Sequence, residues 1–450
     1  MRKSIIALLA LGAFCAAAVA GDFNWKQQSG KSINVLLVQH PYGEGITTKL
    51  AEFEAATGIK VNISIIPEEN YFDKLTTSLS SHSGDPDVYM TGAYQVWEYA
   101  PPGYMVDLST FIEDPGKTAP DYNFADFYDG IVGALRWDLV PGHKVGVGPQ
   151  WALPLGFETN CLSYNKEVLD KFGVAVPKTM DELLAAATKL NKFEGEGTYG
   201  IALRGTRNWA TIHPGYMTAF TNYGAQDLAI EGGKLVSKVN APEAVAMTDA
   251  WVKLIKAGGS PTWASYTWYQ CGADLGARKA AIMFDADILG YFNDFPDASN
   301  QSGKLGSAPP PLPAGKTKIN ANLWVWSIAM NADSKAKDAA WLFIQYFTSR
   351  PYQFWSVTDW KAVDPPRKSV FEDPKFQAVV GEFDGFLDMF AKTVPGTTIC
   401  FTPNPYFFEL TTEWAATLQD LVAGNYPSTQ AAMDALKVKM DRALEDVELE

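Results

Sequence analysis

The chain has 450 residues, with 37 Lys and Arg against 51 Asp and Glu, and its formal net charge is −14. An acidic chain is a poor partner for nucleic acid or an anionic membrane surface, because both attract basic patches. A single hydrophobic core stops growing beyond roughly 250–300 residues, so the length favours two lobes.

The N-terminal segment has the pattern of a secretory signal peptide. Arg2 and Lys3 precede an apolar run over residues 5–19, and an Ala-x-Ala site ends at Ala20. Such a segment is removed before the protein folds. We therefore expect residues 1–20 to be cleaved and the mature protein to reach the periplasm. No later apolar run approaches the roughly 20 residues that a membrane-spanning helix needs.

The first half of the mature chain alternates strand and helix patterns. The expected elements are a strand at 32–39, a helix over 46–57 closed by Gly58, a strand at 61–65, a helix around 72–79 and a strand at 88–90. This order predicts a parallel sheet with helical crossovers. Ligands of such sheets collect beyond the carboxyl ends of the strands, where residues 40–42 and 91–95 lie.

The second half is richer in helix patterns. Thr179 and Glu182 form a capping box that opens a helix through Leu190. The further expected elements are a helix from 242, a strand at 323–330, and helices from 334, at 410–422 and at 428–444. We expect two α/β lobes between which the chain crosses more than once. The expected N-terminal lobe is 21–155 with 313–360, and the C-terminal lobe is 156–312 with 361–450.

Three cysteines follow the expected cleavage site, Cys161, Cys271 and Cys400. An odd number in an oxidising compartment permits one disulfide and one free thiol. We expect a bridge between Cys271 and Cys400, and a structural rather than catalytic role for the cysteines.

Motifs for cofactor or metal chemistry are missing from the sequence. Gly195–Gly200 matches G-x-G-x-x-G, but it follows a helix and leads into a strand, which is the reverse of the nucleotide-binding order. The four histidines are scattered without metal-ligand spacing. We therefore expect neither a cofactor nor a metal.

Several polar residues are candidates for a site. Glu158 lies within the apolar run 153–165, where a buried carboxylate is costly unless it is paired. Asp285 and Asp287 share one face of an extended stretch; they suit backbone capping, ligand binding or glycoside hydrolysis. An Arg near Trp209, either Arg204 or Arg207, suits hydroxyl or carboxylate recognition, and a surface salt bridge explains either equally well.

Segments distributed over the whole mature chain resemble one family. They include FEAATGIKV at 53–61, GDPDV at 84–88, LSYNK at 162–166, VPKTMDE at 176–182 and AAIM at 280–283. The chain thereby resembles the extracellular solute-binding proteins of ABC importers, in the sugar-binding class similar to maltose-binding protein. The resemblance implies a two-lobed periplasmic-binding-protein fold, each lobe a mainly parallel sheet flanked by helices. A hinge of several chain crossings joins the lobes in that fold.

The resemblance also implies a ligand cleft between the lobes and delivery of the ligand to a membrane permease. The positions that it assigns to ligand binding are Tyr42, Tyr94, Gln95, Glu158, Arg207, Trp209, Asp285, Asp287, Trp324, Trp326 and Arg367. Ile288 stands near a position where the family usually has Trp, which reduces the aromatic platform needed for a long oligosaccharide. The stretch around Arg367 is more similar to the polyol and small-glycoside members.

The favoured interpretation is therefore a monomeric binding protein for a sugar, sugar alcohol or small glycoside, and not an enzyme. A secreted carbohydrate-active hydrolase or lyase is the alternative, with Glu158, Asp285 or Asp287 as acid and base. A third interpretation is the same fold with a peptide, polyamine or metal as ligand. The lack of metal-ligand clusters and of enough acidic residues for a polycation disfavours it.

Overall fold

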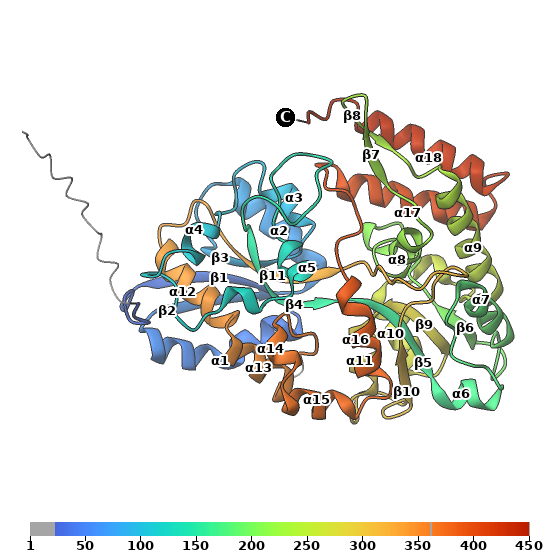
Figure 1. The fold of residues 1–450 in the computed structure, drawn as a ribbon, viewed down its shortest axis with the longest axis horizontal. Helices are drawn as coiled ribbons and strands as arrows, with labels where there is room; N and C mark the ends of the chain where they lie inside the picture. The colour runs from blue at the N-terminus through green and yellow to red at the C-terminus, as the bar shows by residue number, and fades with distance from the viewer. Residues whose placement is uncertain (1–22, 361, 450) are drawn as a thin grey trace, which may run out of the picture.

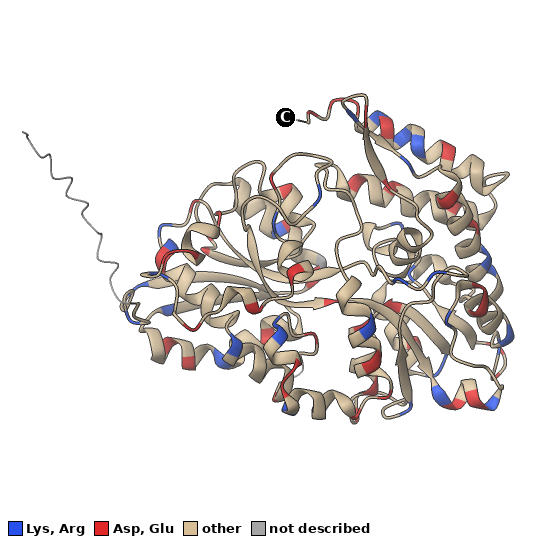
Figure 2. Ribbon diagram, in the orientation of Figure 1, with Lys and Arg blue, Asp and Glu red and all other residues tan. Residues whose placement is uncertain are grey.

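The computed structural model describes residues 23–360 and 362–449. The expected signal peptide lies outside this range. Two lobes lie side by side, each built on its own sheet, with helices on both faces (Figure 1). Lys and Arg are interspersed with Asp and Glu over both lobes rather than gathered into one basic surface (Figure 2). No helix within the described residues is long and apolar enough to cross a membrane.

The N-terminal lobe contains the first elements of the chain and a later segment that returns to it. Its elements are β1 (Ser32–Val38), α1 (Pro41–Thr57), β2 (Lys60–Ile66), α2 (Glu68–Ser80), β3 (Val88–Thr91), α3 (Gln95–Tyr99), α4 (Ser109–Ile112), η1 (Phe124–Asp126), α5 (Asp129–Gly133), β4 (Ala152–Glu158), β11 (Trp324–Met330), α12 (Lys337–Phe347), α13 (Arg350–Thr358), α14 (Lys368–Phe371) and α15 (Pro374–Gly381).

The C-terminal lobe holds the middle of the chain and its last helices. Its elements are β5 (Asn160–Asn165), α6 (Lys166–Lys171), α7 (Met180–Lys189), β6 (Tyr199–Ala202), η2 (Trp209–Thr211), α8 (Gly215–Asn222), β7 (Leu228–Glu231), β8 (Lys234–Ser237), α9 (Pro242–Gly258), η3 (Trp263–Ser265), α10 (Trp268–Gly276), β9 (Ala280–Ala286), α11 (Asp287–Asp294), β10 (Leu305–Ala308), α16 (Phe386–Thr393), η4 (Val394–Gly396), α17 (Phe407–Ala423) and α18 (Thr429–Ala443).

The sheets are mixed rather than mainly parallel. The N-terminal sheet has the order β2-β1-β3-β11-β4, and the C-terminal sheet has the order β10-β5-β9-β6. Strands β1, β2 and β3 pair in parallel, as do β6 and β9, whereas β11 and β5 are antiparallel to their neighbours. The reason lies in the crossings, because β11 and β5 enter their lobes from the hinge while the parallel strands run toward it.

The chain crosses between the lobes later than expected on two occasions. Strand β4 continues to Glu158 and β5 begins at Asn160, so the expected boundary at residue 155 falls inside β4. After residue 360 the chain stays with the N-terminal lobe, where Arg367 donates to the carbonyl oxygens of Thr348 and Asn123. The last crossing therefore follows α15, and α16 packs against β5 and β10.

Local signals in the sequence account for many helix ends. Gly58 closes α1 in the left-handed conformation with φ 72°, and Thr179 and Glu182 form the expected capping box of α7. The expected disulfide is wrong: Cys161, Cys271 and Cys400 are all free thiols. Cys271 is buried on α10, whereas the backbone of Cys400 donates to Asn322 at the second crossing. The two cysteines therefore belong to different structural surroundings.

Candidate ligand-binding site

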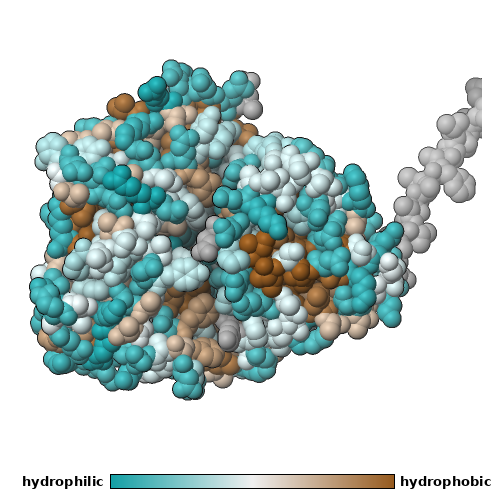
Figure 3. Space-filling view, turned by 180° about the vertical axis from the view of Figure 1, so that it is seen from behind, coloured by the Kyte–Doolittle hydropathy of each residue, from teal (hydrophilic) through white to brown (hydrophobic). Residues whose placement is uncertain are grey.

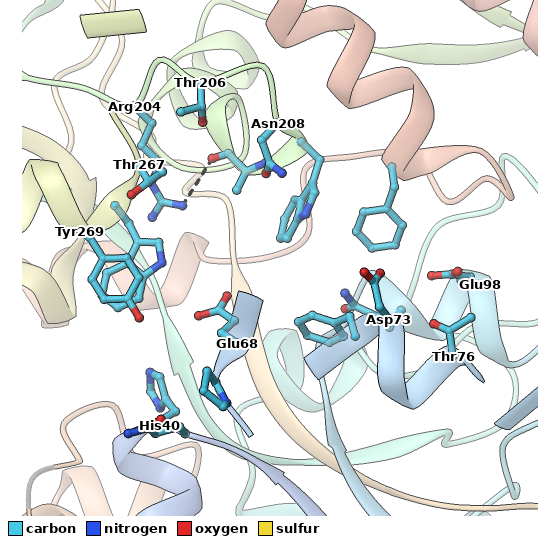
Figure 4. A pocket seen from close by; sticks show the side chains of 18 of the residues that line it. His40, Glu68, Asp73, Thr76, Glu98, Arg204, Thr206, Asn208, Thr267 and Tyr269 are labelled. Carbon is cyan, nitrogen blue, oxygen red and sulfur yellow. Dashed lines mark hydrogen bonds between the residues drawn. The ribbon is translucent and has the colours of Figure 1, made fainter. Parts of the chain in front are cut away.

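A cleft of about 1210 Å³ separates the two lobes (Figure 4). The beginnings of α1 and α2 and the segment around α3 form its N-terminal wall, and the loop after β6 and the start of α10 form the other wall. Its lining includes Gln39, His40, Pro41, Glu44, Glu68, Phe72, Asp73, Gln95, Glu98, Arg204, Thr206, Asn208, Trp209, Trp268, Tyr269 and Phe408. The face opposite to that of Figure 1 is largely hydrophilic, with hydrophobic residues gathered in a patch on the N-terminal lobe and in smaller areas elsewhere (Figure 3).

A smaller hollow of about 50 Å³ lies at the base of the cleft. The cleft and the hollow share His40, Glu68, Arg204 and Trp209 among their lining residues. The hollow has further walls from Glu158, His213, Trp268, Ile288, Leu289, Trp324 and Trp326. Aromatic rings thus surround a few polar groups, which is the usual composition of a small-molecule site.

Glu158 and Trp326 are brought together by the pairing of β4 with β11. Trp324 lies opposite Glu158 and Trp326 opposite Gly156 in this antiparallel ladder. The indole N–H of Trp326 donates to Oε1 of Glu158 over 2.9 Å. The second carboxyl oxygen of Glu158 makes no hydrogen bond to any described residue, so it is available to a molecule in the hollow.

Trp324 occupies its position because Gly92 has no side chain. A Cβ atom at Gly92 would lie 2.1 Å from the Trp324 ring and 2.5 Å from Oε1 of Gln95. The Trp324 ring is 5.4 Å from that of Trp209 and 5.2 Å from that of Trp326, measured between centroids. The three indoles form one wall of the hollow, and the C–H faces of a polyhydroxylated ligand can pack against such rings.

His40 is an uncharged member of the wall. Its ring stacks on Tyr42 at 5.1 Å and tilts against Trp326 at 4.9 Å. Burial lowers the pKa of His40 to about 3, so the imidazole is neutral at physiological pH. Its Nδ1 accepts from the backbone N–H of Tyr42 at 3.4 Å, so the neutral ring has Nε2–H as a donor for a ligand hydroxyl group.

Glu158 is also held in its neutral form. Burial raises the pKa of Glu158 to about 8, although Arg204 and the Trp326 hydrogen bond act in the opposite direction. A protonated carboxyl group carries one donor and retains acceptor capacity. Glu158 therefore suits a hydroxyl group, which needs both kinds of partner.

Arg204 and Asp285 meet because their strands are parallel neighbours. Ala202 of β6 lies beside Met283 of β9, so the residues two positions further on come together at the carboxyl ends of the strands. Arg204 Nε lies 2.9 Å from Oδ2 of Asp285, and Nη2 lies 2.5 Å from Oδ1. Asp285 is fully buried behind Arg204, which itself lines the cleft and the hollow.

Asp287 belongs to a buried cluster at the seam between the lobes. Its Oδ1 accepts from the backbone N–H of Thr159. The carboxyl group of Asp364 is fully buried close to Asp287, and neither of its oxygens has a hydrogen-bond partner among the described residues. Burial, and then the charge of Asp287, raise the pKa of Asp364 well above its usual range. The hydroxyl group of Tyr42, also buried, has no hydrogen-bond partner among the described residues.

The structure separates the expected site residues into groups. Gln95, Glu158, Trp209, Trp324 and Trp326 line the cleft or the hollow. Tyr42, Tyr94, Asp285 and Asp287 are buried behind the lining. Tyr94 binds the hinge instead: its hydroxyl group donates to the carbonyl oxygen of Leu323 at 2.9 Å and is 2.9 Å from Nδ1 of His213.

Arg207 and Arg367 lie outside the lining. Arg207 is exposed and pairs with Asp420 on α17, with Nη2 and Oδ1 2.5 Å apart. Arg367 is fully buried in the N-terminal lobe, where its guanidinium lies 4.0 Å from the centroid of the Phe127 ring. In both residues the guanidinium contacts other parts of the protein rather than the cleft or the hollow.

Sequence reasoning missed several lining residues, chiefly Glu68 and Trp268, and of its two candidate arginines it assigned Arg207 rather than Arg204 to ligand binding. A usable signal existed for Arg204, since it follows a strand directly, whereas Arg207 lies three residues further along the loop. Trp268 opens α10 behind the Thr267 capping box, which gives no indication that the ring faces the cleft. No group of three or more His, Cys, Asp or Glu that could hold a metal ion occurs in the described part of the chain.

This geometry, a cleft between two α/β lobes joined by several crossings, defines the class of periplasmic-type binding proteins. The family model for bacterial extracellular solute-binding proteins matches residues 39–354. The erythritol/L-threitol-binding protein of Mycolicibacterium smegmatis is 39% identical over 412 residues, which cover 91% of this chain and 86% of the relative. The chain therefore belongs to the bacterial extracellular solute-binding protein family.

Solved structures agree on the fold. A solute-binding protein of Agrobacterium radiobacter in complex with ribitol has a TM-score of 0.77 and 24% identity, and the match covers 92% of this chain and 99% of that one. Maltose-bound MalE3 of T. maritima also has a TM-score of 0.77, with 21% identity, 92% coverage of this chain and 100% of the other. At these identities the likeness shows the two-lobed fold alone. The expected fold and family are confirmed, and the family consists of binding proteins rather than enzymes.

Proposed function

We propose that this protein captures a small, uncharged polyol in the cleft between its lobes and delivers it to the membrane subunits of an ABC importer. The observation that carries the proposal is the hollow of about 50 Å³, walled by indole rings, with Glu158 and His40 in neutral form. A cavity needs roughly 10–15 Å³ to hold one water molecule. The hollow therefore has room for a few hydroxyl-sized groups.

The chemistry of the lining favours a polyol over an oligosaccharide. Ile288 and Leu289 border the hollow on the side of α11 and limit its extent. Each hydroxyl group of a polyol both donates and accepts, and neutral Glu158 can do the same. Neutral His40, whose Nδ1 already accepts from the backbone N–H of Tyr42, offers its Nε2–H as a donor. Gln95 also lines the adjoining cleft, and its buried Oε1 has no hydrogen-bond partner among the described residues. The similarity to an erythritol/L-threitol-binding protein supports a ligand of about this size.

Export to the periplasm, by cleavage of residues 1–20, is part of this proposal, as is a monomeric state. Capture by lobe closure requires contacts that only the closed form makes. Residues from both lobes line the hollow, Glu68 from one and Arg204 from the other, so a ligand between them would stabilise closure. Figure 4 shows these two side chains on opposite walls.

A melting-temperature panel tests the proposal. The mature protein is heated with erythritol, L-threitol, ribitol, mannitol or maltose, and the added compound is then recovered and identified by mass spectrometry. We expect the largest stabilisation with the short polyols and recovery of the compound unchanged. A larger shift with maltose would contradict the proposed ligand class, and chemical conversion of the compound would contradict a binding role.

A further inference from the structure

The ion pair between Arg204 and Asp285 determines the charge that the hollow presents. Arg204 is the only Lys or Arg among the described residues that line the hollow. Three of its contacts with Asp285 fall between 2.5 and 3.1 Å, and Nη1 lies 3.4 Å from the carbonyl oxygen of Ala210. Both charged groups are removed from water, because Asp285 is fully buried and Arg204 is 8% exposed.

The other titratable groups of the hollow do not supply a positive charge in place of that of Arg204, which is paired with Asp285. Glu158 and Glu68 face Arg204 from the N-terminal side of the hollow, and His40 and His213 complete the titratable lining. Burial lowers the pKa of His213 well below its ordinary value, as it does for His40, so both imidazoles are neutral. Arg204 is therefore the one basic side chain at the hollow among the described residues, and it is paired with Asp285.

Without Asp285 as a partner, the buried Arg204 would make the hollow a binding site for anions. A guanidinium binds carboxylates through two parallel hydrogen bonds, and a dry, concave site strengthens that attraction. Sugar acids differ from polyols of equal length only at one end, where a carboxylate replaces a hydroxymethyl group. Shape alone discriminates poorly between them.

We propose that Asp285 is a specificity-determining residue. By forming an ion pair with Arg204, it prevents Arg204 from binding the carboxylate of a sugar acid, so that the hollow prefers uncharged polyols. This inference rests on the proposed polyol-binding function. Asp285 does not itself line the hollow, so it acts through Arg204.

Calorimetric titrations of wild type and Asp285→Asn with erythritol and with erythronate, the four-carbon sugar acid, test this inference. For wild type we expect erythritol to bind at least about 100-fold more tightly than erythronate, because a carboxylate would lose its hydration in the hollow without gaining an unpaired cation. Asp285→Asn keeps an acceptor oxygen and the side-chain shape. We expect it to narrow this preference at least tenfold, mainly by tighter erythronate binding.

Asp420→Asn provides a matched control, since it removes one carboxylate from the exposed ion pair with Arg207. We expect it to keep the wild-type preference. The double variant Arg204→Gln/Asp285→Asn removes both charges and should lose the gain in erythronate binding. A thermal melt of each variant, without ligand, checks that it is folded.

The possible results separate the two proposals. If wild type binds no polyol, the proposed function fails, and this inference fails with it. If wild type binds erythritol and erythronate equally well, or if folded Asp285→Asn keeps the full preference for erythritol, the inference alone is overturned. If Asp285→Asn does not fold, the test is the ratio of the erythritol and erythronate affinities of wild type. A ratio near one overturns the inference.

Discussion

The indole N–H of Trp326 donates a 2.9 Å hydrogen bond to Glu158 across the antiparallel strands β11 and β4. This bond fixes one carboxyl oxygen at the point where the chain first leaves the N-terminal lobe, and the other oxygen faces the hollow. Glu158 is thereby held by the sheet, at the end of β4, rather than on a loop.

Replacement of Glu158 by Ala should weaken ligand binding by about 1–3 kcal/mol, the usual effect of an unpaired buried hydrogen-bond partner. Replacement by Gln should cost less at neutral pH, because an amide, like the protonated carboxyl group, both donates and accepts. Titration calorimetry with erythritol measures both. Equal affinities for wild type and Glu158→Ala would make Glu158 a structural acid.

Glu158 should also give the folded protein a specific dependence on pH. Burial raises its pKa from 4.5 to about 8. Below pH about 4.5 the group is protonated in both the folded and the unfolded chain, so it adds nothing. Between about 4.5 and about 8 it is ionised in the unfolded chain only, and its contribution to the free energy of unfolding falls by up to about 1.4 kcal/mol per pH unit.

Glu158→Gln removes this contribution but leaves the buried Asp287 and Asp364, whose pKa values burial also raises. Denaturant unfolding of both proteins from pH 4 to 9 gives the difference in their unfolding free energies. We expect the unfolding free energy of the variant to rise steadily relative to that of wild type as the pH increases to about 8. A difference that does not change with pH would show that Glu158 ionises normally.

Gly92→Ala tests the placement of the Trp324 ring without changing any polar group. The added Cβ would lie 2.1 Å from the ring, so the ring must move into the hollow or away from it. We expect a loss of affinity of at least about tenfold, which corresponds to 1.4 kcal/mol. Gly133→Ala in the same lobe is the control, since its Cβ meets only ordinary contact at 3.6 Å. Unchanged affinity in Gly92→Ala would remove Trp324 from the ligand wall.

We expect substitutions of Arg204 and Arg207 to affect polyol affinity differently, although the two residues are close in the sequence. Arg204→Lys keeps the charge but loses the planar fork that holds Asp285, so we expect weaker polyol binding by about tenfold. Arg207→Lys alters an exposed pair with Asp420 and should leave the dissociation constant unchanged. The reverse outcome would restore Arg207, and not Arg204, as the ligand-side arginine.

The sequence predicted the architecture better than the site because strand and helix patterns are local. The alternation from Ser32 to Met90 and the capping box at Thr179 specify elements without reference to distant residues. The antiparallel direction of β11 could not be read in this way, since it depends on where the chain returns from the other lobe.

Some of the expected residues that line the cleft or hollow are unusual in their own segments. Glu158 stands out as an acid in an apolar strand, and Trp324 and Trp326 as two large rings on one face. Arg204, Glu68 and Trp268 needed tertiary information, because only the pairing of β6 with β9 and the opposition of the lobes give them a shared space. The position of Arg367 also depends on tertiary structure. Its guanidinium packs on the rings of Tyr122 and Phe127, which are far away in the sequence, so its own segment gives no indication of this burial.

The central claim is that the hollow selects a short, uncharged polyol, and a calorimetric titration of ligand-free protein with erythritol and with maltose tests it most directly. We predict one molecule of erythritol bound per chain, with an affinity at least tenfold above that for maltose. Saturable binding of maltose with no heat from erythritol would contradict the account.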